Sequence, residues 1–397
     1  TGLTDIGYKT VLYGEDGRML YGLQDAEGLG ARFFDEVTGE MVTAKWVAYD
    51  AGLSAFADDF GAFVFWARVG NAGYLITNQE GDVQHGFLFS GKYAIHANLE
   101  SGMLDFGWFL DSNNEYCYAN ENTGLLVSGE AALRNSPLDY GAYHWFYFDS
   151  SSYSLAHGWR YLGAQGKWVY YDDGGGWMLY GQQRLHANSS DQDWHWYYFD
   201  EETGAVQYGF KWIRPQHKVV YYDLIYGWML YGWHSINNYA YCFDATDGHL
   251  AAVDAGDSRI SRYTNWMIDI ALDDSHGYDQ AYRWGERGDY DCSSLVISAL
   301  KASGLNTGSA TYTGNMRSQL TARGFKWMTD FSELRPGDIL LNEVYHTAIY
   351  LGNNLLVHAS GNEFDDAVGG KPGDQTGEEI YIRTYYWRPW DGFLRIV

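Results

Sequence analysis

The stretch KWVYYDDGGGWMLYG at residues 167–181 decides the fold of the first part of the chain, because it returns as KVVYYDLIYGWMLYG at residues 218–232. The two copies lie 51 residues apart and agree at 11 of 15 positions. The same spacing relates HWFYFD (144–149) to HWYYFD (195–200). Self-similarity at a fixed period indicates an array of one supersecondary unit.

That unit is predicted to be a β-hairpin. Each aromatic run reads as a short strand, and each TG or DGG reads as a turn in which glycine supplies a positive φ. A single hairpin cannot bury its own aromatic face, whereas stacked neighbours can. Fainter copies such as GRMLYG (17–22) and FFDEVTGEM (33–41) extend the pattern toward the start. We therefore predict a multidomain chain that begins with a β-hairpin repeat solenoid over residues 1–255.

The composition agrees with such an array, and the net charge limits the classes of molecule that the chain can bind. The 397 residues include 48 Gly and are 18% aromatic, which is typical of many short strands joined by tight turns. Residues 1–255 carry 13 Lys and Arg against 32 Asp and Glu, a net charge of −19. Residues 256–397 carry 13 against 19, a net charge of −6. A chain this acidic repels nucleic acid and anionic lipid, so we expect neutral or cationic partners.

No segment of the chain is predicted to enter a membrane. No apolar run approaches the roughly 18 residues that a membrane helix needs. The opening TGLTDIGYKT also lacks the basic-then-apolar pattern of a signal peptide. The missing leader is not taken as a sign of a cytoplasmic protein.

The pattern changes near AAVDAGDSRI (251–260), where the aromatic hairpins stop and a helical spacing begins. A second, α+β domain is therefore predicted over residues 256–397. Its first helix should bury an apolar face made of Ile260, Tyr263, Met267, Ile270 and Ala271.

The three cysteines are too few for a disulfide framework. Cys117 and Cys242 lie in similar aromatic strands and are interpreted as small apolar fillers. Cys292 stands instead in DYDCSSLVISAL (289–300), where Asp291 is a good N-cap and the cysteine opens the first helical turn. Unsatisfied N–H groups and the helix dipole stabilise a thiolate there, provided that the Asp291 charge is used in capping.

Two histidines are the candidates for a base. HTAIYL and LLVHAS are apolar runs separated by GNN, which predicts a hairpin. His346 and His358 are 12 residues apart, an even number, so both should project from the same face. One imidazole could then face Cys292 with the other behind it, as a nucleophile, a base and an orienting group.

The sequence YDCSS, followed by PGD, HTAIYLG and VHAS, resembles the NlpC family of papain-like cell-wall cysteine peptidases. The resemblance covers nearly all of residues 260–397 and implies that Cys292 is the nucleophile, His346 the general base and His358 the orienting residue. It also implies a tyrosine beside the thiol, for which Tyr278 and Tyr282 are candidates. Tyr278 is favoured because HGYDQ resembles the phage-lysin branch. Ser294 departs from the usual Gly, and Thr347-Ala348 from the usual Val-Gly.

The first part of the chain resembles the choline-binding and cell-wall-binding repeats of Gram-positive surface enzymes, through HGWRYLGAQGKWVYYD (157–172) followed by GWMLYG (176–181). The resemblance implies a ligand, held by an aromatic cage, that is either a choline on teichoic acid or another wall glycan. The departures are a longer turn before Trp177 and a Val that interrupts WVYY. The alternative is that these aromatics are only solenoid core. The candidate ligand-binding residues are Trp159, Trp177, Tyr180, Trp228 and Tyr231.

Together these resemblances imply an extracellular, wall-associated peptidoglycan hydrolase that requires no metal and no cofactor. The bond cleaved would lie in the stem peptide, as in D-γ-glutamyl–diamino acid endopeptidases, or would be that of an N-acetylmuramoyl-L-alanine amidase. The rival of another class is a non-catalytic wall- or glycan-binding surface protein. The stretch 362–379, acidic and rich in glycine, is interpreted as a solvated loop, with a lid or a cation site as alternatives.

Overall fold

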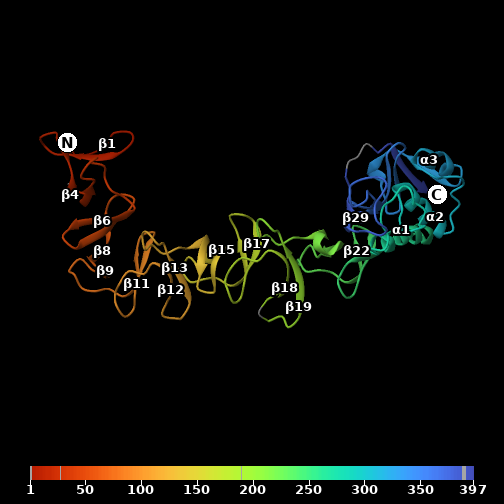
Figure 1. Ribbon diagram of the computed structural model, residues 1–397. Helices are drawn as coiled ribbons and strands as arrows, with labels where there is room; N and C mark the ends of the chain where they lie inside the picture. The colour runs from red at the N-terminus through yellow and green to blue at the C-terminus, as the bar shows by residue number, and fades with distance from the viewer. Residues whose placement is uncertain (1, 27, 189, 387–389) are drawn as a thin grey trace. The chain divides into compact units, whose positions relative to one another are not determined.

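The computed structural model describes residues 2–26, 28–188, 190–386 and 390–397. Short antiparallel strands occupy the chain up to residue 254, and the α-helices gather in the C-terminal part (Figure 1). The strands before the first α-helix are β1 (Gly2–Asp5), β2 (Thr10–Tyr13), β3 (Met19–Leu20), β4 (Gly22–Ala26), β5 (Gly30–Phe34), β6 (Lys45–Asp50), β7 (Leu53–Ala57), β8 (Phe63–Gly70), β9 (Gly73–Thr77), β10 (Gly86–Ser90), β11 (Tyr93–Ala97), β12 (Gly107–Leu110), β13 (Tyr116–Ala119), β14 (Gly129–Ser136), β15 (Asp139–Phe148), β16 (Gly158–Leu162), β17 (Lys167–Tyr171), β18 (Gly181–His186), β19 (Trp194–Phe199), β20 (Gly209–Ile213), β21 (Lys218–Tyr222), β22 (Gly232–Ile236), β23 (Tyr239–Phe243) and β24 (Leu250–Asp254).

Most of these strands pair as two-stranded hairpins, which confirms the predicted unit. Neighbouring hairpins are joined by backbone hydrogen bonds at equivalent positions of the repeat. The Met178 N–H donates to the Trp145 carbonyl, and 51 residues later the Met229 N–H donates to the Trp196 carbonyl, both at 2.8 Å. The hairpins therefore stack in the way that the predicted repeat solenoid requires.

The turns explain why DDGGG and DLIYG are interchangeable. In both copies an aspartate carboxylate, Asp172 or Asp223, accepts two backbone N–H bonds from the residues that follow it. The turn closes on a glycine with positive φ, Gly176 at 69° or Gly227 at 77°. Only this last position needs the left-handed backbone that favours glycine, so the intervening residues are free to vary.

The chain divides into two compact units, Thr1–Leu179 and Tyr180–Val397. In the second unit the last hairpins share a hydrophobic core with the helical part, in which Tyr221, Tyr241 and Val253 lie with Met267 and Ile268. The functional division at residues 255 and 256 stays a prediction.

The C-terminal part is α+β, as predicted. Its six-stranded antiparallel sheet has the order β25-β30-β26-β27-β28-β29. The elements of this part are α1 (Ser258–Ala271), α2 (Cys292–Ala302), α3 (Thr313–Thr321), β25 (Phe325–Met328), a 3-10 turn (Phe331–Glu333), β26 (Ile339–Asn342), β27 (His346–Gly352), β28 (Leu355–Ala359), β29 (Ile380–Thr384) and β30 (Gly392–Ile396). A further 3-10 turn, Arg214–Gln216, lies between β20 and β21 of the repeats.

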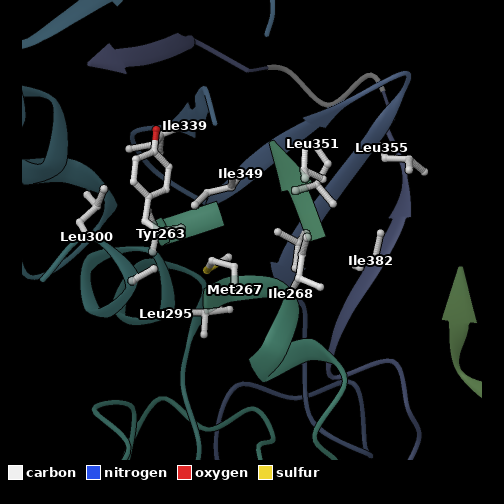
Figure 2. Packing of buried hydrophobic residues seen from close by; sticks show 14 of the residues in the cluster. Tyr263, Met267, Ile268, Leu295, Leu300, Ile339, Ile349, Leu351, Leu355 and Ile382 are labelled. Carbon is white, nitrogen blue, oxygen red and sulfur yellow. The ribbon is translucent and has the colours of Figure 1, made fainter. Parts of the chain in front are cut away.

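The core of this part lies between the helices and one face of the sheet. Helix α1 buries Tyr263 and Met267, which the helical spacing predicted, and Ile268 beside them. Figure 2 shows these side chains near Leu295 of α2 and Ile349 of β27. In the described parts of the chain, no helix has the length and apolar character that a membrane crossing requires.

Candidate active site

Cys292 opens helix α2, and the helix start is built to hold it there. The Asp291 carboxylate accepts the Ser294 N–H at 2.7 Å, and the Ser294 hydroxyl accepts the Asp291 N–H at 2.9 Å. This reciprocal capping box fixes the first turn. Ser294, the departure from the usual Gly, thus closes the cap and is fully buried.

The negative charge of Asp291 is compensated as well as used in capping. Its carboxylate also accepts the Ser293 hydroxyl at 2.9 Å, and it forms an ion pair with the Arg283 guanidinium. The Asp291 carboxylate is therefore used in capping, which the sequence analysis required for a thiolate at this position. Arg283 was not singled out from sequence, since nothing in its spacing shows that it reaches the helix start.

Burial nevertheless keeps the thiol protonated. Cys292 is 7% exposed, and desolvation, followed by the Asp291 charge, raises its pKa to about 12. The backbone N–H groups of Thr347 and Ser293, together with Arg283, act in the opposite direction. Loss of hydration is the larger of these effects on the pKa, so burial favours the neutral thiol over the thiolate.

His346 and His358 contact each other directly. His346 Nε2 lies 2.7 Å from His358 Nδ1, and both rings are almost fully buried. In the antiparallel pairing of β27 with β28, Ile349 lies opposite Val357, which puts the two histidines on one face as the even spacing predicted. Thr347, whose N–H approaches the Cys292 thiol, directly follows His346. The structure thus brings the two histidines together, and it brings the Cys292 thiol to the backbone of the residue that follows His346.

Aromatic rings surround the histidine pair. The His358 ring centroid lies 5.1 Å from that of Tyr381, its partner on β29. The His346 ring lies 5.9 Å from that of Trp390. These two aromatic rings restrict the imidazoles to the orientation that the hydrogen bond between them requires.

Of the two candidate tyrosines, Tyr278 lies at the site. Tyr278 is 5% exposed and interacts electrostatically with Cys292, and burial raises its pKa to about 12. The Gln280 amide donates to its hydroxyl oxygen at 3.1 Å. Tyr282 is 37% exposed, and the Arg287 guanidinium covers its ring at 3.4 Å.

The acidic loop is more than a solvated segment, because its end is buried beneath the site. Glu379 is fully buried, and it accepts the Tyr278 N–H at 2.9 Å and the Gln375 N–H at 3.2 Å. Burial raises the pKa of Glu379 to about 7. The interpretation of 362–379 as a solvated loop is therefore wrong at this end. A glutamate in a run of acidic and glycine residues gives no sequence signal of burial.

Residues 279–388 match the model of the NlpC/P60 family. These residues form an NlpC/P60 domain. The family consists of cysteine peptidases and amidases that act on peptidoglycan, and the chain is an enzyme of this class.

Three of the solved structures that resemble the chain come from Streptococcus pneumoniae. CbpJ of strain TIGR4 is 18% identical, over 63% of this chain and 87% of that chain, with a TM-score of 0.35. Choline binding protein F is 18% identical, over 63% of this chain and 93% of that chain, with a TM-score of 0.37. The modular autolysin LytC, in complex with a synthetic peptidoglycan ligand, is 14% identical over 64% of this chain and 47% of that chain, with a TM-score of 0.32. No curated protein matches the chain.

A cluster with metal-ligand spacing lies outside the catalytic groups of the NlpC/P60 domain. In the described ranges it consists of Asp244, Asp247 and His249 in the turn between β23 and β24. The Lys218 ammonium lies 3.3 Å from Asp247 and already compensates part of this charge.

Two candidate ligand-binding residues of the repeats are stacked on histidines. Trp177 stacks on His144 at 5.1 Å between ring centroids. The equivalent Trp228 stacks on His195 at 4.3 Å and on Tyr226 at 4.4 Å. Both tryptophans are partly buried, so these rings contribute to packing between hairpins.

The other three candidates lie on or beside strands. Trp159 meets the cross-strand Tyr170 edge-on, with ring centroids 5.2 Å apart. Tyr180 is partly buried, whereas Tyr231 is 37% exposed. Ligand binding by these residues stays a prediction.

Proposed function

We propose that the chain hydrolyses an amide bond in the stem peptide of peptidoglycan, with Cys292 as the nucleophile, His346 as the general base and His358 as the orienting residue. The observation that supports this most strongly is the 2.7 Å hydrogen bond between His346 and His358, together with the Thr347 N–H, directly after His346, that approaches the Cys292 thiol. A buried imidazole pair and a thiol in the first turn of a helix can supply the three roles of a nucleophile, a base and a group that holds the base.

The neutral state of the thiol determines the first step. Because burial keeps Cys292 protonated, His346 accepts the thiol proton as sulfur attacks the carbonyl carbon. His346 Nε2 faces His358, so Nδ1 is the nitrogen assigned to this proton. In this assignment the Nε2–H of His346 donates to Nδ1 of His358, and that hydrogen bond fixes the tautomer and the ring orientation of His346.

The following steps return the site to its starting state. Backbone N–H groups at the start of α2, together with the Tyr278 hydroxyl, stabilise the oxyanion of the tetrahedral intermediate. His346 then gives its proton to the leaving amine, and a thioester of Cys292 remains. Water attacks the thioester with His346 as the base, and the product is a free carboxylate.

The bond assigned is that between D-γ-glutamate and the diamino acid of the stem peptide. This assignment follows the resemblance of YDCSS, HTAIYLG and VHAS to the NlpC pattern. The phage-lysin character of HGYDQ favours the second candidate, the bond between N-acetylmuramic acid and L-alanine. The non-catalytic alternative is disfavoured because a binding protein has no need of a buried Cys292 beside two hydrogen-bonded histidines.

The repeats are assigned a tethering role at the cell wall, outside the cell. Tethering raises the concentration of the catalytic domain near its substrate without new contacts at the site. Choline-bearing teichoic acid and another wall glycan are the two ligands proposed for Trp159, Trp177, Tyr180, Trp228 and Tyr231. The acidic charge of residues 1–255 favours a neutral or cationic ligand group over bare phosphate.

Digestion of purified peptidoglycan tests the proposal. The wild type and Cys292→Ala are incubated with walls of several types, and the released fragments are read by mass spectrometry. A new γ-carboxylate on D-glutamate, or a new amine on the diamino acid, identifies the endopeptidase. A free lactyl carboxylate on muramic acid identifies the amidase. Release of no fragments by the wild type from any wall overturns the proposal.

A further inference from the structure

Two successive repeats place a cation of the chain itself on the face of a tyrosine. The Arg160 guanidinium carbon lies 4.0 Å from the ring centroid of Tyr147. The Lys211 ammonium lies 4.5 Å from that of Tyr198. Both pairs span neighbouring hairpins, from β15 to β16 and from β19 to β20.

The two pairs occupy the same register of the repeat. Strands β16 and β20 begin at Gly158 and Gly209, 51 residues apart, and the cation is the third residue of each strand. The tyrosines are separated by the same 51 residues. The arrangement is therefore a property of the repeat and is made with either of two different cations.

The surroundings of both tyrosines are also conserved between the two repeats. Tyr147 packs on Tyr171 with ring centroids 6.0 Å apart, and Tyr198 packs on Tyr222 at 6.2 Å. A carboxylate accompanies each cation, since Asp149 lies 3.8 Å from the Arg160 guanidinium. Asp200 interacts electrostatically with Lys211 in the same way. An aromatic face beside a carboxylate has the chemistry that holds a quaternary ammonium group.

In the preceding repeat an aromatic ring, rather than a cation, covers the ring at the position equivalent to Tyr147. At the equivalent positions, 51 residues earlier, Phe109 stacks on His96 with ring centroids 4.6 Å apart and an interplanar angle of 19°. His96 is paired in turn with Asp105 at 2.6 Å. In all three repeats a side chain of the next hairpin occupies the face at which an external cation would bind.

We infer that Arg160 and Lys211 are specificity-determining residues of the repeats, which close two aromatic faces to quaternary ammonium groups by occupying them from within the chain. This inference rests on the proposed wall-binding function of the repeats, and it selects between the two ligand classes proposed for them. The wall polymer is held without choline at these two faces, so a glycan lacking quaternary ammonium groups is the ligand that fits the repeats.

Titration of the full-length chain with choline chloride tests the inference, with binding followed by intrinsic fluorescence and calorimetry. The double variant Arg160→Ala/Lys211→Ala should gain saturable binding at least about tenfold tighter than that of the wild type, because a cation–π contact is made available at each face. The conservative double variant Arg160→Lys/Lys211→Arg keeps both cations and should bind choline as the wild type does. Near-ultraviolet circular dichroism checks that the hairpins remain folded.

The matched charge control is Lys45→Ala, which removes an exposed lysine from β6. It should leave choline binding as in the wild type. The inference is overturned if the wild type already binds choline as tightly as the double alanine variant, if that variant gains nothing, or if Lys45→Ala gains as much. Because no wall is present in the titration, failure of this inference is separate from failure of the peptidoglycan digestion.

Discussion

Cys117 in the repeats and Cys292 in the NlpC/P60 domain are both buried, yet their surroundings differ. Burial raises the pKa of each thiol to about 12. Around Cys117 the charges that act on the thiol, those of Asp111 and Glu115, raise its pKa further. Around Cys292 the Asp291 charge also raises the pKa, but two backbone N–H groups and Arg283 lower it, and the residue after His346 supplies one of those N–H groups. The two buried thiols therefore differ in their neighbours rather than in their burial, and these neighbours favour Cys292 as the proposed nucleophile.

The largest expected effect separates these two cysteines directly. Cys292→Ala should lower fragment release from peptidoglycan by at least about 10³-fold, because no other group replaces the nucleophile. Cys117→Ala should retain wild-type turnover, since this thiol lies in strand β13 of the repeats. Turnover is measured on purified peptidoglycan at matched protein concentrations. Loss of activity in Cys117→Ala, or its retention in Cys292→Ala, would contradict the comparison.

The histidines allow the same comparison. His358→Ala should lower kcat on the order of 10²- to 10⁴-fold, because His346 then loses the partner that fixes its tautomer and orientation. The matched control is His195→Ala, which removes a ring that stacks on Trp228 in the repeats and should leave kcat unchanged. The measurement is a steady-state rate on soluble muropeptides, which do not require the repeats. Equal rates for His358→Ala and the wild type would remove His358 from the mechanism.

The pH dependence of alkylation sharpens the account of the thiol. In the absence of substrate, the rate of Cys292 modification by iodoacetamide should keep rising above the ordinary cysteine pKa of about 8.5, because burial raises its pKa. Asp291→Asn retains a helix cap but removes a negative charge, so the apparent pKa of Cys292 should fall. Modification is read by peptide mapping, with Cys117 as the internal reference. A plateau below pH 8 in the wild type would show a resting thiolate and contradict the neutral-thiol step.

The smallest expected effect concerns the buried carboxyl below Tyr278. The pKa of Glu379 is raised from 4.5 to about 7, so its protonated form is favoured in the folded state. Stability from this group is complete below pH 4.5 and is lost as the pH rises toward 7, by up to about 3 kcal/mol. Glu379→Gln removes the titration, so its Tm relative to that of the wild type should increase between pH 5 and pH 8. A constant difference in Tm over this range would show that Glu379 does not titrate there.

Much of the fold follows from local patterns in the sequence. Repeated aromatic runs with a glycine at the end of each turn predict the hairpins, because the turn at Gly176 or Gly227 needs a positive φ. The even spacing of His346 and His358 predicts a shared face, because side chains alternate along a strand. The helix cap at Asp291 is likewise a local signal.

Features that depend on contacts between distant segments could not be predicted. Glu379 reaches Tyr278 across 101 residues. The Arg283–Asp291 pair spans only eight residues, but it depends on the irregular path of the chain between them. The neutral state of Cys292 was also beyond the sequence, since the helix N-terminus is a local feature whereas desolvation depends on the surrounding fold. The cations over Tyr147 and Tyr198 come from the next hairpin, so only the stacking of repeats brings them into place.

The most direct test of the central claim is to trap the covalent intermediate. Wild-type protein is mixed with soluble muropeptides, quenched with acid within one turnover, and digested for mass spectrometry. An acyl fragment of the stem peptide is expected in thioester linkage on the peptide that contains Cys292, and none on the peptide that contains Cys117. Turnover of the substrate with no adduct on Cys292, or with an adduct on another residue, would contradict the account.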